Sequence, residues 1–124
     1  MDSQQAKQIL GRYRPGVDDD DPQFAEAYRV LATRVVQAGG PIDAQIERLF
    51  RLATRRRPRI EETALLRRYY ETQRSEFTAD RERATQLLAV GVTPGDASID
   101  PVTLASMSRV AALAMNTPDA YSIR

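Results

Sequence analysis

Residues 42–66, IDAQIERLFRLATRRRPRIEETALL, carry the clearest indication of the fold class, because a helical pattern lies on each side of a proline. In the first pattern apolar residues recur every three or four positions, as they do on one face of an α-helix: Ile42, Ile46, Leu49, Phe50 and Ala53. Pro58 cannot continue this helix, since it has no amide hydrogen to donate. A second helix is therefore expected to start near Ile60.

On both sides of this stretch, apolar stripes between helix-breaking residues recur along the chain. One stripe runs from Pro22 to the glycine pair 39–40, and another follows the helix-start pair Asp100-Pro101. The helix that starts near Ile60 is either broken or bent at residues 78–80, and we favour a break. No segment alternates as a β-strand does. The predicted fold is all-α: a compact bundle of five to six helices with antiparallel neighbours and no sheet.

The chain is expected to have one main domain. We assign residues 1–20 to a short N-terminal helix and an acidic linker, and residues 21–124 to the helical domain. The aspartates 18–21 are interpreted as caps of the helix that begins at Pro22, since Asp is a preferred N-cap residue. A calcium loop is the alternative, but the run lacks the spaced ligands, the Gly and the final Glu of an EF-hand.

The periodicity also predicts which side chains form the core. These are Phe24, Leu31, Val35, Ile46, Leu49, Phe50, Leu66, Tyr69, Leu88, Leu104 and Val110. Adjacent residues of a helix point about 100° apart. Of the neighbours Tyr69 and Tyr70, at most one is therefore expected to be central to the core.

The composition excludes several kinds of chemistry, because the 124 residues include no His, Cys or Trp. Cys/His zinc sites, Ser-His or Cys-His catalysis and covalent c-type haem all require one of the first two residues. No G-x-S-x-G elbow, phosphate-binding Gly-rich loop or dinucleotide fingerprint occurs. Four glutamates are expected to lie among arginines on helix faces, which favours the charged form and makes them poor proton donors: Glu61, Glu62, Glu71 and Glu76. We expect no catalytic residue, no cofactor and no metal.

Seventeen of the eighteen basic residues are Arg, and the net charge is +1. We attribute this bias to a GC-rich genome, with a functional role of the arginines as the alternative. The only basic cluster is formed by Arg55, Arg56, Arg57 and Arg59. It is either a phosphate-contacting patch or an ordinary helix end, where Arg meets free carbonyls and the negative end of the dipole. We favour the helix end, because Glu61 and Glu62 follow directly and offset the charge.

The exposed side of the helix over residues 42–54 is expected to carry Glu47, Arg48, Arg51 and Arg55. We expect the arginines of this region to pair mainly with nearby glutamates rather than to be merely solvated, since Arg67 and Glu71 lie four apart on one helix. The arginines are Arg48, Arg51, Arg55, Arg67, Arg68 and Arg74, and the glutamates are Glu47, Glu61, Glu62, Glu71 and Glu76.

Three stretches carry a resemblance to a known family. Residues 21–24, DPQF, resemble an Asn-Asp-Pro-x-Phe helix opening. Residues 46–66 resemble an R-x-F-x-L-A-x-x-R-x-P-x-x-x-E-x-x-x-L pattern, and residues 110–124 resemble a closing V-A-x-x-L-L-N-x-x-E-F-x-x-R. Together they are similar to the C-terminal domain of unknown function of planctomycete-type proteins with c-type cytochrome regions near their N-termini. Departures are the aspartates before Pro22, Met107 in place of a Trp, and Arg59-Ile60 in place of a Thr/Ser-Pro cap.

The resemblance covers roughly 100 residues and implies a full-length protein of the cell envelope or periplasm, although the N-terminus is too polar for a secretory signal. It transfers no catalytic residue and no cofactor. No stretch approaches the ~20 apolar residues of a membrane span. We therefore expect a non-catalytic helical interaction or structural domain, whose partner is a protein or another domain of a larger chain. The alternative is a small nucleic-acid-binding or regulatory helical protein that uses the cluster at residues 55–59.

Overall fold

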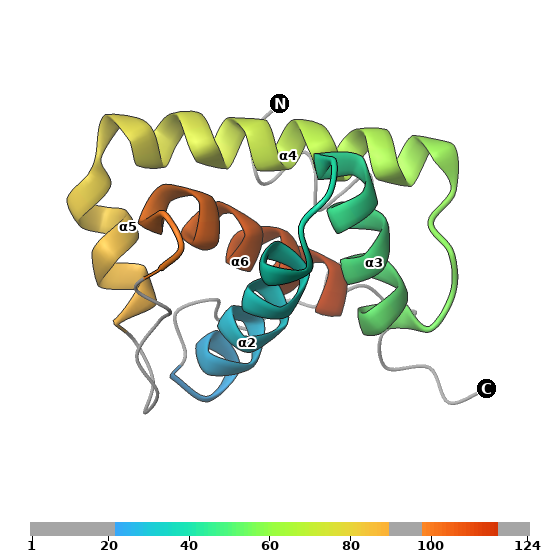
Figure 1. Ribbon diagram of the computed structural model, residues 1–124, viewed down its shortest axis with the longest axis horizontal. Helices are drawn as coiled ribbons and strands as arrows, with labels where there is room; N and C mark the ends of the chain where they lie inside the picture. The colour runs from blue at the N-terminus through green and yellow to red at the C-terminus, as the bar shows by residue number, and fades with distance from the viewer. Residues whose placement is uncertain (1–21, 90–97, 117–124) are drawn as a thin grey trace.

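The structure is a computed structural model that describes residues 22–89 and 98–116, with side chains from residue 26 onward. These residues form five helices and no strand, so the all-α prediction is confirmed (Figure 1). The helices are α2 (Pro22–Ala38), α3 (Ile42–Thr54), α4 (Ile60–Ala79), α5 (Arg81–Leu88) and α6 (Pro101–Met115). The helix expected within residues 1–20 and the acidic linker lie outside the described residues.

Helix α6 lies in the middle of the bundle. It packs against α2, α3, α4 and α5, and Figure 1 shows it beneath α4, with α3 and α5 at opposite ends of the view. It is buried almost all round, whereas the sequence periodicity predicts one buried face. The other faces carry Ala and Ser beside the larger Val102 and Leu113, and all of these are buried. The small residues let neighbouring helices approach closely, and an all-round buried helix is characteristic of a domain centre.

Local sequence signals set the helix ends. Gly39 and Gly40 have φ values of +74° and +95°, in the left-handed region that favours glycine, and they end α2. The expected break after α4 is confirmed, because Asp80 caps α5 by accepting a hydrogen bond from the Arg83 amide at 3.2 Å. Asp100 caps α6 in the same way, accepting from the Thr103 amide at 3.2 Å.

Most of the predicted core is buried: Val35, Ile46, Leu49, Phe50, Leu66, Tyr69, Leu104 and Val110. For Leu31 and Leu88 the prediction is wrong, because both side chains are only partly buried at the edge of the core. Leu31 lies beside the face of α2 that turns towards α6, and Leu88 is the last residue of α5. The side chain of Phe24 lies outside the described residues.

The prediction that at most one of Tyr69 and Tyr70 is central to the core is wrong, because both are buried. Helix α4 contacts α3, α5 and α6, and its buried residues therefore cover a wide arc. At 100° per residue this arc, from Leu65 to Tyr70, spans about 140°. Two adjacent tyrosines fit within it.

Truncation of Leu49 should be costly. Leu49→Ala is expected to lower the free energy of unfolding by roughly 2–5 kcal/mol, because the side chain is fully buried and its loss leaves a cavity. Leu52→Ala is the matched control in the same helix: Leu52 is 44% exposed, and its truncation should cost less than about 1 kcal/mol. Urea denaturation of both variants checks the prediction, and equal losses would contradict the placement of the two faces of α3.

Candidate functional site

The arginine cluster predicted at residues 55–59 forms the junction between α3 and α4. Arg55 is the C-cap of α3, with a left-handed φ of 64°. Its amide donates to the Arg51 carbonyl oxygen at 2.8 Å, which satisfies one of the free carbonyls at the helix end. This backbone arrangement leaves the Arg55 side chain exposed.

Glu62, in the first turn of α4, holds two of the four arginines. Its Oε1 and Oε2 accept from Arg56 Nη1 and Nη2 at 2.9 and 2.8 Å, a two-pronged geometry that matches the guanidinium fork. Glu62 Oε1 also accepts from the Arg59 amide at 2.8 Å, which caps α4. The Arg56 guanidinium lies 4.8 Å from the centre of the Phe50 ring, a cation–π distance. We call Arg56, Arg59 and Glu62 the clasp.

The hydrogen bonds from Arg56 lower the pKa of Glu62 to about 2; partial burial acts in the opposite direction but is outweighed. The clasp therefore divides the cluster. Arg56 and Arg59 are bound to Glu62, whereas the side chains of Arg55 and Arg57 are exposed. The structure thus does not present the four arginines as one free patch.

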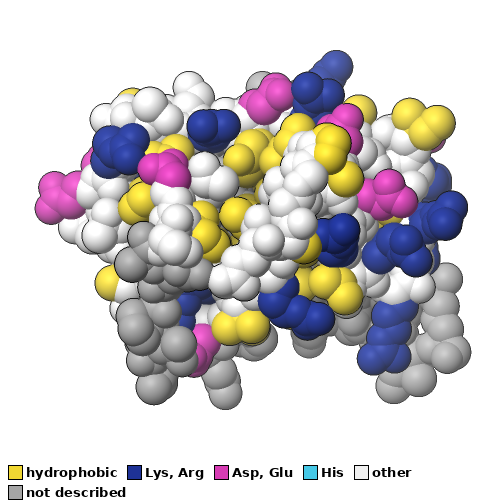
Figure 2. Space-filling model, viewed as in Figure 1, with side chains coloured by type: hydrophobic (Ala, Val, Ile, Leu, Met, Phe, Trp, Pro, Cys, Tyr) yellow, Lys and Arg dark blue, Asp and Glu magenta, His cyan; other side chains and the backbone are white. Residues whose placement is uncertain are grey.

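A second set of arginines lies along the outer face of α3. Arg48 and Arg51 are three residues apart, which places them on one side of the helix, and Arg55 follows at its C-cap. All three are exposed and line the same depression. Their side chains form no ion pair with any residue that the structure describes. Figure 2 shows Lys and Arg side chains gathered on the side of the molecule where Figure 1 places α3.

The same face is slightly hollowed and partly apolar. Leu52 lies among the arginines, and a shallow depression of about 550 Å³ is lined by Ala44, Glu47, Arg48, Arg51, Leu52 and Arg55. We call Arg48, Arg51, Leu52 and Arg55 the α3 face. It combines positive charge with an exposed aliphatic side chain.

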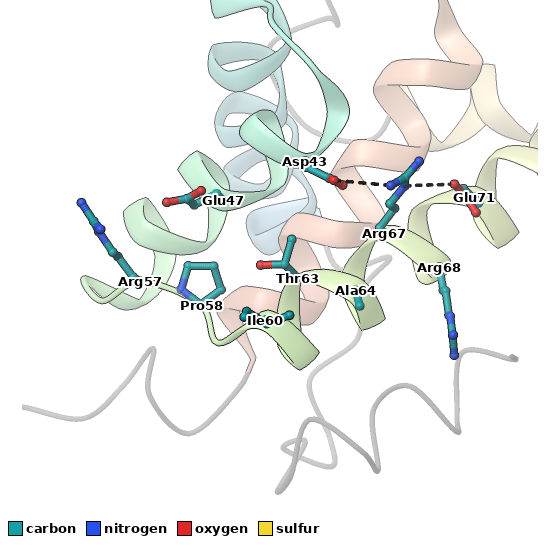
Figure 3. A pocket seen from close by; sticks show the side chains of 10 residues that line it. All are labelled: Asp43, Glu47, Arg57, Pro58, Ile60, Thr63, Ala64, Arg67, Arg68 and Glu71. Atoms are coloured by element: carbon teal, nitrogen blue, oxygen red, sulfur yellow. Dashed lines mark hydrogen bonds and ion pairs between the residues drawn. The ribbon is translucent and has the colours of Figure 1, made fainter.

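A larger groove of about 740 Å³ lies between α3 and α4 (Figure 3). Arg67 crosses it: Nη1 lies 3.4 Å from Asp43 Oδ2 on α3, and Nε lies 3.3 Å from Glu71 Oε1 on α4. Around Ile60 the groove is apolar, with Pro58 and Ala64 beside it. Figure 3 shows Arg57 and Arg68 at opposite ends of this stretch, both pointing away from Arg67.

Of the expected arginine–glutamate pairs, Arg67–Glu71 is present. Glu62 also pairs with arginines, but with Arg56 and Arg59. The other predicted arginines form no such pairs among residues 26–89 and 98–116: Arg48, Arg51, Arg55, Arg68 and Arg74. The physical reason is that holding two long side chains in one geometry costs about as much entropy as an exposed ion pair returns.

The prediction that Glu47 and the arginines of α3 lie on the exposed side is confirmed. Two features of the site are not predicted by the sequence. One is the exposure of Ile60, which is 87%. The other is that Glu47 lines both the depression on the α3 face and the groove. Neither has a signal in the sequence, because both depend on the path of the chain between α3 and α4.

The described residues contain no cluster of three or more Asp or Glu that could hold a metal ion. Of the helices described, none has the length and apolar character needed to cross a membrane. What the arrangement offers chemically is recognition: free guanidinium groups, each able to grip a carboxylate with two hydrogen bonds, next to exposed aliphatic surface.

Loss of the Glu62 charge should destabilise the fold in a pH-dependent way. Glu62→Gln is expected to lower the free energy of unfolding by about 1–2 kcal/mol at neutral pH, with solvent screening taken into account. The pKa of Glu62 falls from 4.5 to about 2 on folding, so its stabilisation is present above pH 4.5 and is lost as the pH falls towards 2. The gap between the native protein and the variant should close over that range.

Urea denaturation at several pH values measures this gap. Glu61→Gln is the matched control, since Glu61 is an exposed carboxylate of the same helical turn without an ion pair to the described residues. Equal, pH-independent effects of both substitutions would show that the clasp contributes nothing specific.

The Arg67 bridge can be tested by double-mutant cycles. Arg67→Ala and Glu71→Ala, made singly and together, are expected to show a coupling of about 0.3–0.5 kcal/mol in thermal or urea unfolding. The control cycle uses Arg68 and Glu71, which lie three apart on α4 without an ion pair. Additive effects in both cycles would mean that Arg67 and Glu71 do not interact in solution.

Known proteins provide no independent assignment of this site. The resemblance to the planctomycete-type domain rests on the residues quoted above, and it stays a prediction. Function is accordingly inferred from the chain's own side chains. No protein-family model, no curated protein and no solved structure matches this chain.

Proposed function

We propose that this chain is a non-catalytic helical interaction domain that binds an acidic segment of a protein partner through the α3 face. The observation that carries the proposal is the row of exposed guanidinium groups at Arg48, Arg51 and Arg55. They form no ion pair with the residues that the structure describes, and this arrangement supports contact with anionic groups of a partner. The partner is either a separate protein or another domain of a larger chain.

Electrostatic complementarity gives such a face its selectivity. Exposed charge pairs contribute little each, but a row of like charges steers an oppositely charged partner and fixes its register. Leu52, between the arginines, adds aliphatic surface that an ordinary solvated charge cluster lacks. Arg also forms two parallel hydrogen bonds to a carboxylate, which Lys does not.

Nucleic acid is the alternative partner, and the structure gives it less support. Two arginines of the predicted cluster, Arg56 and Arg59, are bound to Glu62. Glu47 borders the α3 face and would repel a continuous phosphate backbone, whereas a protein segment can place an uncharged residue there. The net charge of +1 supplies no general attraction for a polyanion.

The resemblance noted in the sequence extends this proposal. By that resemblance, the domain would be the terminal module of an envelope protein that carries cytochrome regions elsewhere. Its role would then be to hold another domain or protein in place rather than to carry electrons. The absence of His and Cys from this chain fits a non-redox role.

Charge reversal on α3 tests the proposal. Arg48→Glu combined with Arg51→Glu is expected to weaken binding of a short glutamate-rich peptide roughly tenfold or more, because two attractive contacts become repulsive. Fluorescence anisotropy at low and moderate salt measures the affinity. Arg74→Glu is the control, since Arg74 is an exposed arginine of α4 outside the α3 face.

Two results would overturn the proposal. One is peptide binding that the double reversal leaves unchanged. The other is salt-dependent binding of single- or double-stranded nucleic acid that is tighter than binding of the peptide and is lost in the same variant; this would establish the alternative.

A further inference from the structure

The groove between α3 and α4 adjoins the α3 face. Glu47 lines both surfaces, so a segment bound along α3 can continue into the groove. The groove holds the most exposed large hydrophobic side chain of the described residues, Ile60, at 87%. Pro58 and Ala64 extend this apolar stretch (Figure 3).

The charges along the groove are unevenly satisfied. Arg67 contacts both Asp43 and Glu71, so its single positive charge is fully engaged and one carboxylate charge is left in excess. Arg57 and Arg68 form no ion pair with described residues, and they lie at the two ends of the apolar stretch in Figure 3. An exposed aliphatic side chain with a free cation on each side is complementary to an apolar residue with flanking carboxylates.

We propose that the groove is a second contact site for the same partner, in which an apolar side chain of the partner covers Ile60 and neighbouring carboxylates reach Arg57 and Arg68. The partner segment is therefore a mixture of acidic and apolar residues rather than a uniformly acidic one. This inference rests on the proposed function, because the α3 face supplies the first contact.

Side-chain contacts connect the walls of the groove before a partner arrives. The clasp joins the junction to the first turn of α4, where Ile60 is the first helical residue. Arg67 bridges Asp43 of α3 to Glu71 of α4. A preformed site loses little conformational entropy on binding. The free energy gained by burying Ile60 therefore contributes to the affinity for the partner.

Glu47 restricts which residue of a bound partner segment can lie between the α3 face and the groove. It is exposed and lies where the two surfaces meet, so a carboxylate or phosphate at that point would be repelled. An uncharged residue at the crossing would be accepted. The arrangement thus favours a segment whose acidic residues are interrupted over one whose negative charge is continuous.

The experiment compares two synthetic peptides of equal length and charge, one of Glu and Ser and one of Glu and Leu. The native domain is expected to bind the Glu/Leu peptide about tenfold more tightly, the effect of burying one aliphatic side chain. Ile60→Ser should remove this advantage while leaving binding of the Glu/Ser peptide unchanged. Val30→Ser is the matched control, since Val30 is an exposed aliphatic residue of α2, 49% exposed and outside both surfaces.

The outcomes separate the two proposals. If the Arg48→Glu, Arg51→Glu variant loses both peptides but Ile60→Ser behaves like Val30→Ser, the groove inference fails and the proposed function stands. If the native domain binds neither peptide, both fail. Thermal melting confirms that the variants are folded, which their exposed positions favour. Loss of the leucine advantage in Ile60→Ser alone supports the inference.

Discussion

Helix α6 is surrounded by α2, α3, α4 and α5, and these helices bury much of their apolar surface against it. This arrangement is possible because α6 is built largely from small side chains, so that four neighbours can approach one axis. Its far end is tied in by Asn116, whose Nδ2 donates to the Tyr28 hydroxyl at 3.0 Å and to the Ala112 carbonyl oxygen at 2.7 Å. Buried polar groups that are paired in this way hold a specific arrangement without an unsatisfied donor.

The positions of the α3 face and the groove depend on how α3 and α4 pack against α6. With their inner faces turned towards α6, α3 and α4 present their polar faces outward, and the α3 face and the groove lie on those outward faces. The junction between them is then held by side-chain contacts. Glu62 binds Arg56 and Arg59, and Arg67 joins the two helices further along. The arginines consequently divide into those that hold the structure and those that are left for a partner.

Signals that act within a few residues could be predicted from the sequence. The end of α2 at two glycines, the break at Asp80 and the start of α6 after Asp100 all depend on local capping and backbone preferences. The central position of α6 could not be predicted, because it depends on how four other helices pack around it. Tyr70 was misjudged for the same reason, since the width of the buried arc depends on the neighbours of α4.

The candidate site also combines features that the local sequence predicts with features that depend on the tertiary structure. Helical spacing predicts that Arg48, Arg51 and Arg55 share an exposed face. It does not predict that Glu62 pairs with Arg56 and Arg59, because these residues lie on either side of a non-helical segment to which helical spacing does not apply. Nor does it predict the exposure of Ile60, since an isoleucine at a helix start is as compatible with burial as with exposure. Both depend on the path of the chain between two helices.

The central helix is also the last of the described helices along the chain, which has a consequence for how the protein is made. During synthesis α2 to α5 leave the ribosome before α6, against which each of them packs. Their apolar faces therefore lack this part of their native cover until residues 101–115 have emerged. Domain closure is thus a late, long-range event, and the nascent chain passes through a stage in which exposed apolar surface invites chaperones or aggregation.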